Sequence, residues 1–159
     1  MAETSRRAAR RSAKSGVPNA LFVVASAERP PAELTGRADH LDIFLPWGSL
    51  LRGTLALDPA AARGIAALLR PGGTAAAYVS ITERDATDLP PLHEGSCPEI
   101  AARWSAFGLC VDSFRRATVD EIVATGSTWA KRLSADSDRP AWRLAIRGPA
   151  PDESVADAI

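Results

Sequence analysis

The sequence has few cysteines, no G-x-G pair and no long hydrophobic run. Its two cysteines in 159 residues, Cys97 and Cys110, exclude a disulfide framework and a four-cysteine zinc site, and we expect both to be small buried residues. No run approaches the roughly 18 consecutive apolar residues of a membrane helix. The basic start at residues 1–11 is not followed by an apolar signal core. We therefore expect a cytoplasmic protein with no membrane partner.

The charge balances over the whole chain but not along it. The 19 basic residues equal the 19 acidic ones, yet residues 1–14 carry five basic side chains against one acidic. Four of these, at positions 6, 7, 10 and 11, would share one face of a helix. Such a face is either simply solvated or binds phosphates. Residues 149–159 are acidic and lack an apolar period, so we predict a disordered tail.

Short apolar runs alternate with helical patterns. Strands are predicted at 19–26, 41–45, 75–81, 109–114 and 142–146. Helices are predicted at 2–14, 58–70, 97–105, 118–125 and 127–134, the second of them with Asp58 as its cap, Pro59 in its first turn and Gly72 after its end. This alternation is typical of a single α/β domain whose mainly parallel sheet is covered on both faces.

The segment Phe44–Gly53 is the most unusual part of the chain. A predicted strand ends at Pro46-Trp47-Gly48, which puts an indole ring at the carboxyl end of a strand, where α/β enzymes contact ligands. The alternative is a packing tryptophan, which is the interpretation we give to Trp104 and Trp142. The two histidines, His40 and His93, lie far apart in sequence and are interpreted as structural or surface residues.

Several motifs together resemble a known family. The Pro-Trp-Gly turn and the later Arg-Pro-Gly-Gly turn at 70–73 are similar to turns of class I S-adenosylmethionine-dependent methyltransferases. The strings PNALFVVASAERPPAEL, FLPWGSLLRG and GSTWAKRL, in this order, resemble the aminoglycoside-resistance 16S rRNA (adenine(1408)-N(1))-methyltransferases, the KamB/NpmA family. The resemblance implies a Rossmann-like fold, S-adenosyl-L-methionine as cofactor, and methylation of an adenine N1 in 16S rRNA at the decoding site of the small ribosomal subunit, giving aminoglycoside resistance.

The resemblance also implies roles for individual residues. Two tryptophans would hold the flipped target adenine: Trp47 and Trp129. Cofactor-pocket positions, including two hydroxyls that line the same site, would be Ala27, Glu28, Phe44, Ser49 and Ser127. Contacts to rRNA would be made by Arg6, Arg7, Arg10, Arg11, Arg132 and Arg139.

One departure from the family pattern concerns the cofactor. The glycine-rich loop and the ribose-binding acidic residue of the family precede the position that Met1 matches, so residues 1–148 are expected to form a partial methyltransferase domain without its first strands. Adenine N1 has a free lone pair, so the methyl transfer requires no general base and no metal. Separately, we expect the protein to be a monomer. Two alternatives stay open: a non-catalytic RNA-binding remnant of such an enzyme, and a fragment that folds poorly because its sheet has lost central strands.

Overall fold

The computed structural model describes residues 23–82, 85, 88–127 and 139–150. The predicted helix at 2–14, most of the one predicted at 127–134 and residues 151–159 of the predicted tail lie outside these ranges. In chain order the elements are η1 (Ala32–Leu34), β1 (Ala38–Phe44), α2 (Gly48–Thr54), α3 (Pro59–Leu68), β2 (Leu69–Val79), η3 (Glu94–Ser96), α4 (Cys97–Ser105), β3 (Cys110–Arg116), α5 (Val119–Ala124) and β4 (Trp142–Arg147).

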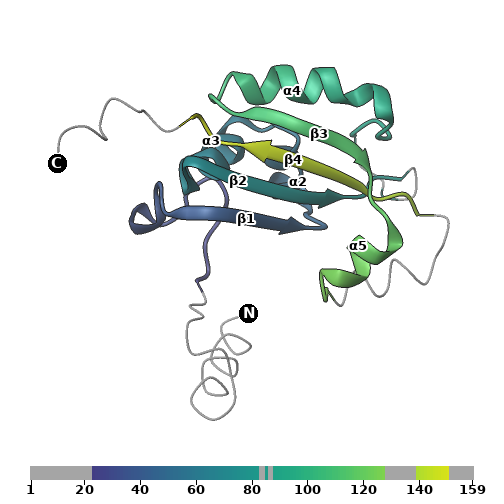
Figure 1. The fold of residues 1–159 in the computed structure, drawn as a ribbon, viewed down its shortest axis with the longest axis horizontal. Coiled ribbons are helices and arrows are strands. Elements are labelled where there is room, and N and C mark those ends of the chain that lie inside the picture. The colour runs from purple at the N-terminus through teal and green to yellow at the C-terminus, as the bar shows by residue number, and fades with distance from the viewer. Residues whose placement is uncertain (1–22, 83–84, 86–87, 128–138, 151–159) are drawn as a thin grey trace, which may run out of the picture.

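The four strands form one mixed sheet in the order β1-β2-β4-β3 (Figure 1). Strands β1 and β2 are parallel, with Ile43 opposite Ala77. Strand β4 runs antiparallel to both of its neighbours, and its Leu144 lies opposite Ala77 and Phe114. Only one of the three pairings among the described strands is parallel, so the prediction of a mainly parallel sheet is not confirmed; the sheet is mixed because β4 is reversed between β2 and β3.

Four of the five predicted strands are confirmed, but the one at 19–26 is wrong in its described part. Residues 23–26 form no strand, and Ser26 makes only an isolated bridge to Arg29. Val23 and Val24 stay exposed. A strand needs a neighbour to pair its backbone groups, and none of the described strands lies beside this segment.

Helix α3 forms where its signals predicted, but it ends earlier. The Asp58 carboxylate accepts hydrogen bonds from the backbone N–H groups of Ala60 (2.9 Å) and Ala61 (3.1 Å), and Pro59 opens the helix. The predicted end at Arg70 and the cap at Gly72 are wrong, because the chain turns extended at Leu69 and enters β2 directly.

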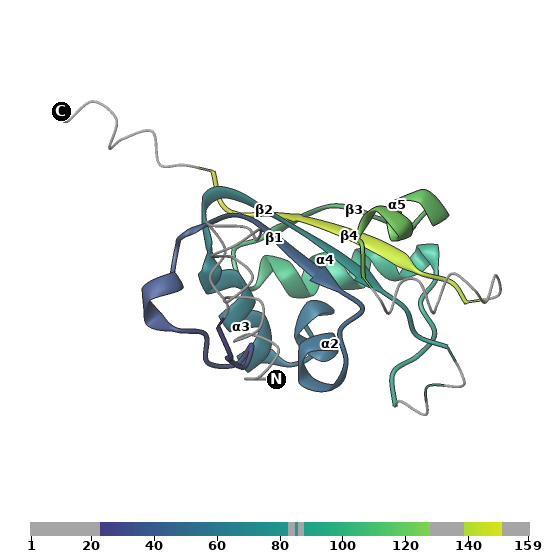
Figure 2. The same ribbon diagram turned by 90° about the horizontal axis from the view of Figure 1, so that it is seen from below.

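Helices cover the two faces of the sheet unequally. Helices α2, α3 and α4 lie on one face, whereas α5 lies on the other (Figure 2). Within the described ranges α5 is the only helix on that second face, so the expected cover on both faces is incomplete there. The short helix α2 has no counterpart among the predicted elements.

The core lies between the sheet and helices α2, α3 and α4. Trp104 of α4 is fully buried, and its Nε1 donates a hydrogen bond to the Thr54 carbonyl at 3.1 Å. Trp142 is buried and stacks on Phe114, with ring centroids 5.1 Å apart. Both tryptophans are therefore packing residues, as predicted. Cys110 is exposed at the start of β3, which contradicts its expected burial.

Candidate functional site

The junction between β1 and α2 forms the centre of the candidate site. The Leu45 N–H extends the sheet by donating to the Tyr78 carbonyl at 2.8 Å, and Leu45 itself has a positive φ of 47°. A non-glycine residue in this region is strained and is held by its surroundings. The strain redirects the chain sharply at the carboxyl end of β1, and Pro46 is buried immediately after it.

Trp47 follows this bend and carries an exposed indole. It is the N-cap residue of α2 in extended conformation, and Gly48 takes a positive φ of 59° as the first helical residue. The Trp47 side chain is 51% exposed. A packing role would bury the ring, so the structure favours the interpretation in which the ring is free to contact a ligand.

Three of the predicted cofactor residues lie together at the start of this helix. Ala27 and Glu28 form the turn between Ser26 and Arg29, and the hydroxyl of Ser49, in the first turn of α2, donates a hydrogen bond to the Glu28 carboxylate. That bond, followed by one from the backbone of Glu28 itself, lowers the pKa of Glu28 despite the opposing effect of desolvation. Glu28 is therefore an anion at neutral pH, with Ser49 as its partner.

The turn at 27–28 is held against α3 by a very close backbone contact. A Cβ atom on Gly64 would lie 1.8 Å from the Ala27 carbonyl oxygen, far inside any allowed contact. Gly64 thus lets the turn approach the helix axis. Sequence reasoning gave no role to this glycine, because nothing in the sequence indicates which backbone segment approaches it.

Phe44 lies on the other side of the junction, next to α5. Its ring is 41% exposed, and its centroid is 5.8 Å from that of Tyr78. A small apolar pocket is lined by these two rings, by Leu45, by Ile122 of α5 and by Thr125, which directly follows α5.

Phe44 lines this pocket, and a second residue predicted for the site, Ser127, lies close to it. The Ser127 backbone N–H donates to the Thr125 hydroxyl at 3.2 Å, which places Ser127 directly after the pocket-lining Thr125. Ser127 therefore lies at the same end of the sheet as Phe44. Tyr78 was missed by sequence reasoning, although the chain has no other tyrosine.

Arg139 is held inside the molecule. Its guanidinium binds the Asp85 carboxylate at 2.9 Å, and its Nε donates to the Ser80 hydroxyl at 2.9 Å. Burial alone would raise the pKa of Asp85, but hydrogen bonds from the Thr82 backbone and from Arg139 lower it overall. The pair ties the segment after β2 to the start of β4, and Asp85 was not among the predicted site residues.

The remaining predicted site residues lie outside the described ranges. These are Trp129, Arg6, Arg7, Arg10, Arg11 and Arg132. The closure of Trp47 and Trp129 over one base therefore stays a prediction. Among the described residues, no group of three or more His, Cys, Asp or Glu side chains is arranged to hold a metal ion, and no helix is long and apolar enough to cross a membrane.

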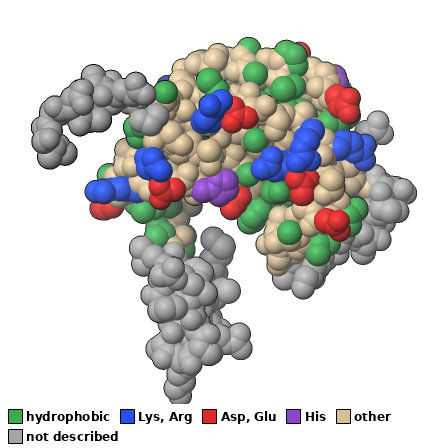
Figure 3. Space-filling view, in the orientation of Figure 1, with side chains coloured by type: hydrophobic (Ala, Val, Ile, Leu, Met, Phe, Trp, Pro, Cys, Tyr) green, Lys and Arg blue, Asp and Glu red, His purple; other side chains and the backbone are tan. Residues whose placement is uncertain are grey.

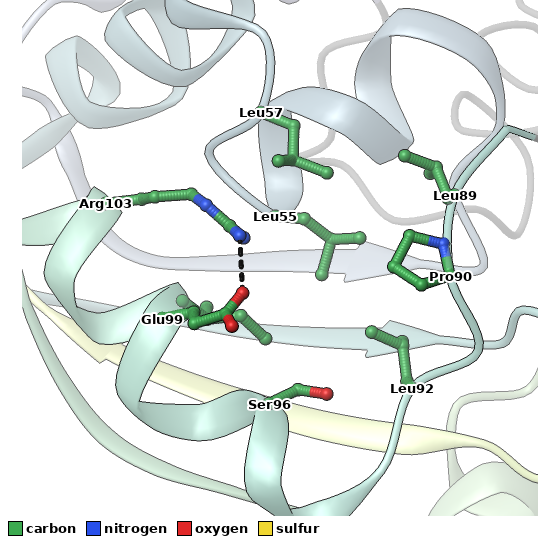
Figure 4. Close-up of a pocket in the computed structure, with 9 residues that line it drawn as sticks. Leu55, Leu57, Leu89, Pro90, Leu92, Ser96, Glu99 and Arg103 are labelled. Carbon is green, nitrogen blue, oxygen red and sulfur yellow. Dashed lines mark hydrogen bonds and ion pairs between the residues drawn. The ribbon is translucent and has the colours of Figure 1, made fainter.

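A second pocket lies on the helical face of the sheet, away from these residues (Figure 4). Leucine side chains from the end of α2 and the segment before η3 line it, together with α4. The Glu99–Arg103 ion pair, at 2.9 Å, crosses its rim. It contains none of the predicted site residues, so we do not assign it to the candidate site.

The sheet order, with an aromatic junction at the carboxyl end of β1, defines a methyltransferase fold. The chain superposes on the 16S rRNA methyltransferase KamB with a TM-score of 0.80 at 32% identity, over 95% of this chain and 72% of that one. It superposes with a TM-score of 0.81 at 29% identity on a Catenulisporales acidiphilia 16S rRNA (adenine(1408)-N(1))-methyltransferase W203A mutant with cosubstrate SAM, over 96% of this chain and 72% of that one.

The sequence comparisons identify the family. Residues 1–147 match the NpmA family, described as 16S rRNA (adenine(1408)-N(1))-methyltransferase, and the chain belongs to this family. A 16S rRNA (adenine(1408)-N(1))-methyltransferase of Streptoalloteichus hindustanus is 36% identical over 148 residues, covering 87% of this chain and 66% of the relative. The corresponding enzyme of Escherichia coli is 26% identical over 150 residues, covering 89% of this chain and 68% of the relative. The chain thus spans about two thirds of the length of these relatives.

Proposed function

We propose that this chain contributes the target-base side and part of the cofactor pocket of an S-adenosylmethionine-dependent methyltransferase that acts on adenine N1 of 16S rRNA in the small ribosomal subunit. The observation that carries the proposal is the half-exposed Trp47 ring, held on a strained strand-to-helix junction beside Glu28 and Ser49. Family membership supports the same activity. From family membership we also propose that the protein is cytoplasmic and confers aminoglycoside resistance.

The described residues fit one part of the cofactor. The ionised Glu28 carboxylate is a hydrogen-bond acceptor suited to the hydroxyl or amino groups of a nucleoside, and the exposed Phe44 ring offers an apolar surface for its base. We assign Ala27, Ser49 and Ser127 to the surrounding positions of the cofactor pocket. The bound cofactor supplies an activated methyl group, and the protein has to bring the adenine N1 to it.

The work of this chain is to extract and orient the base. Pulling a base from its stack costs a few kcal/mol. Stacking on an aromatic side chain returns about 1–3 kcal/mol per base. Trp47 would take one face of the adenine and Trp129 the other, while the carbonyl near Pro46 would accept a hydrogen bond from the exocyclic amine. Because adenine N1 carries a free lone pair, no side chain needs to remove a proton before attack.

The arginines of this chain would bind the rRNA surface. Phosphate contacts give affinity that falls steeply with salt and carries little base specificity. We assign this role to Arg6, Arg7, Arg10, Arg11 and Arg132. Arg139 was predicted for the same role, but its guanidinium binds Asp85, so we propose that it fixes the chain just before β4 instead.

The test combines cofactor binding with methyl transfer. Calorimetry measures S-adenosylmethionine binding to the 159-residue chain, and primer extension on isolated small ribosomal subunits detects methylation of the adenine. Binding and a new stop at one adenine would support the proposal. If the chain binds subunits but neither the cofactor nor a methyl group is taken up, the non-catalytic RNA-binding alternative holds instead. A broad, non-cooperative melt would favour the poorly folding fragment.

A further inference from the structure

Two arginines lie directly opposite each other at the end of the sheet that carries the candidate site. Arg115 of β3 pairs with Arg143 of β4 in the antiparallel register. Like charges in this arrangement repel each other and destabilise a sheet. The two guanidiniums therefore need an anion close to them.

The described part of the chain supplies one carboxylate to this pair. Glu121 of α5 accepts hydrogen bonds from two nitrogens of Arg115, at 2.9 and 2.6 Å, whereas Nε of Arg143 lies 3.8 Å from one of its oxygens. Among the described residues, none accepts a hydrogen bond from Arg143, although its side chain is only 27% exposed. A half-buried cation with five unused N–H groups is costly in isolation and is ready to bind an external anion.

Arg143 belongs to a row of side chains that crosses the sheet to the candidate site. Phe44, Tyr78, Arg143 and Arg115 lie opposite one another on four adjacent strands. Neighbouring strands are about 4.8 Å apart, so Arg143 lies two strands, or about 10 Å, from Phe44. Figure 3 looks onto this face and shows basic side chains gathered beside α5. The row therefore runs from the aromatic pocket to a cationic surface.

A third arginine adds positive charge at the same strand ends. Arg116 is exposed and lies opposite Trp142, and its guanidinium carbon is 5.9 Å from the centroid of that ring. No carboxylate of the described residues forms an ion pair with it. We call Arg115, Arg116 and Arg143 the arginine patch. It holds three cations for the single carboxylate of Glu121 that binds them.

We propose that the arginine patch binds the phosphodiester backbone of the RNA next to the base taken by Trp47, with Arg143 as the direct phosphate contact. The inference rests on the proposed function and extends it to a contact made by the sheet itself. A planar guanidinium with free N–H groups matches two phosphate oxygens. The phosphate would also offset the repulsion between Arg115 and Arg143. An acidic peptide has similar charge but no base for the exposed Trp47 ring, so RNA is the favoured partner.

Filter binding of the full 159-residue chain to isolated small ribosomal subunits, over a range of salt concentrations, tests the contact. Arg143→Gln should weaken binding about 5-fold at roughly 0.15 M salt and reduce the slope of log affinity against log salt by about 0.7–0.9, the value for one lost phosphate contact. Arg143→Lys keeps the charge and should retain the slope. An unchanged slope in Arg143→Gln would overturn the proposal.

Arg147 provides a matched control on the same strand and the same face. It lies four residues after Arg143 and already donates a hydrogen bond to Asp112 at 2.7 Å. Arg147→Gln should change neither the affinity nor the salt slope. Equal effects of the two glutamine variants would show a general dependence on net charge and would refute the site.

Urea unfolding separates RNA binding from a purely structural role. Because Arg143 faces Arg115, Arg143→Gln should leave the urea midpoint unchanged or raise it. A lower midpoint together with an unaltered salt slope would mean that Arg143 serves only the ion pair with Glu121, which would overturn the proposal.

Protein-free 16S rRNA as a second probe identifies the partner. The same loss of slope is expected with it, because phosphate contacts do not depend on base sequence. An effect confined to complete subunits would indicate an acidic ribosomal protein and reject the RNA contact. Methyl transfer with an unchanged slope in Arg143→Gln would reject this contact and leave the proposed function intact. A changed slope without methyl transfer would uphold the contact and reject the activity.

Discussion

Trp47 is the residue on which the proposed chemistry depends most directly. Its ring is half exposed although its backbone is fixed by the Leu45 bend, the buried Pro46 and the start of α2. A rigid backbone with a free ring suits base stacking, because little conformational entropy is lost when the base arrives.

Replacement of Trp47 by alanine separates activity from stability. We expect Trp47→Ala to lower methyl transfer to small ribosomal subunits by about 5- to 150-fold, the equivalent of roughly 1–3 kcal/mol of lost stacking. The free energy of unfolding should change by no more than about 0.5 kcal/mol, since the side chain is exposed. Urea unfolding and primer extension measure the two effects, and Trp47→Phe should retain part of the activity. A large loss of stability with unchanged methylation would contradict the assignment.

At the scale of elements, the short helix α5 depends on a single glutamate. Glu121 and Thr118 form a reciprocal capping box, and Arg115 of β3 binds both carboxylate oxygens, at 2.9 and 2.6 Å. The hydrogen bonds from Arg115, and then that from the Thr118 backbone, lower the pKa of Glu121 from 4.5 to about 2. Helix α5 lines the pocket beside Phe44, so this carboxylate also supports the site.

The depressed pKa predicts how stability depends on pH. The contribution of Glu121 to folding is complete above about pH 4.5 and is lost as the pH falls toward 2, because the unfolded state then binds the proton more readily. Glu121→Gln should therefore be less stable than the unmodified chain at pH 6, and the difference should shrink on acidification. Urea unfolding between pH 6 and pH 3 measures it. A constant difference over this range would show that the carboxylate charge is not involved.

Gly64 determines how closely the turn at 27–28 approaches α3. Because an added Cβ would collide with the Ala27 carbonyl oxygen, we expect Gly64→Ala to destabilise the protein by about 1–3 kcal/mol and to displace Glu28 from Ser49. The neighbouring exposed Arg63 provides the control, and Arg63→Ala should change stability by less than about 0.5 kcal/mol. Urea unfolding compares the two variants, and similar values would mean that the turn moves away without cost.

The elements that sequence patterns predicted best are those with strong local signals. Asp58 and Pro59 predicted the start of α3, and the run around Tyr78 predicted β2, because capping and apolar periodicity are local properties. Helix α2 was missed since it is only seven residues long and begins with Trp47 and Gly48, which are not typical of a helix start. The predicted strand at 19–26 failed in its described part because an apolar run forms a strand only where another strand can pair with it.

The candidate site could be predicted only in part. The motif around Trp47 was visible in the sequence, and the resemblance supplied Glu28, Phe44 and Ser49. The Asp85–Arg139 pair joins residues 54 positions apart, and no local pattern reveals such a contact. The reversed direction of β4 likewise depends on the path of the chain between β3 and β4.

At the scale of the whole molecule, Trp104 links helix α4 to the end of helix α2. Its Nε1 reaches the Thr54 carbonyl, 50 residues away, inside the core. We expect Trp104→Phe to lower the free energy of unfolding by about 1–3 kcal/mol, since it removes a buried hydrogen bond and leaves the carbonyl unpaired. Urea unfolding checks this, with the exposed Trp47→Phe as the control. Equal stability of the two variants would show that the bond contributes nothing.

The unequal surroundings of the tryptophans give the molecule an optical reporter. Trp104 and Trp142 are shielded from solvent, whereas Trp47 is open to it. In a Trp129→Phe variant, which leaves only these three indoles, iodide in solution should therefore quench the fluorescence of Trp47 and spare that of the two buried rings. A nucleoside that stacks on Trp47 should shield it from iodide, so ligand capture at this junction can be followed by light emission alone.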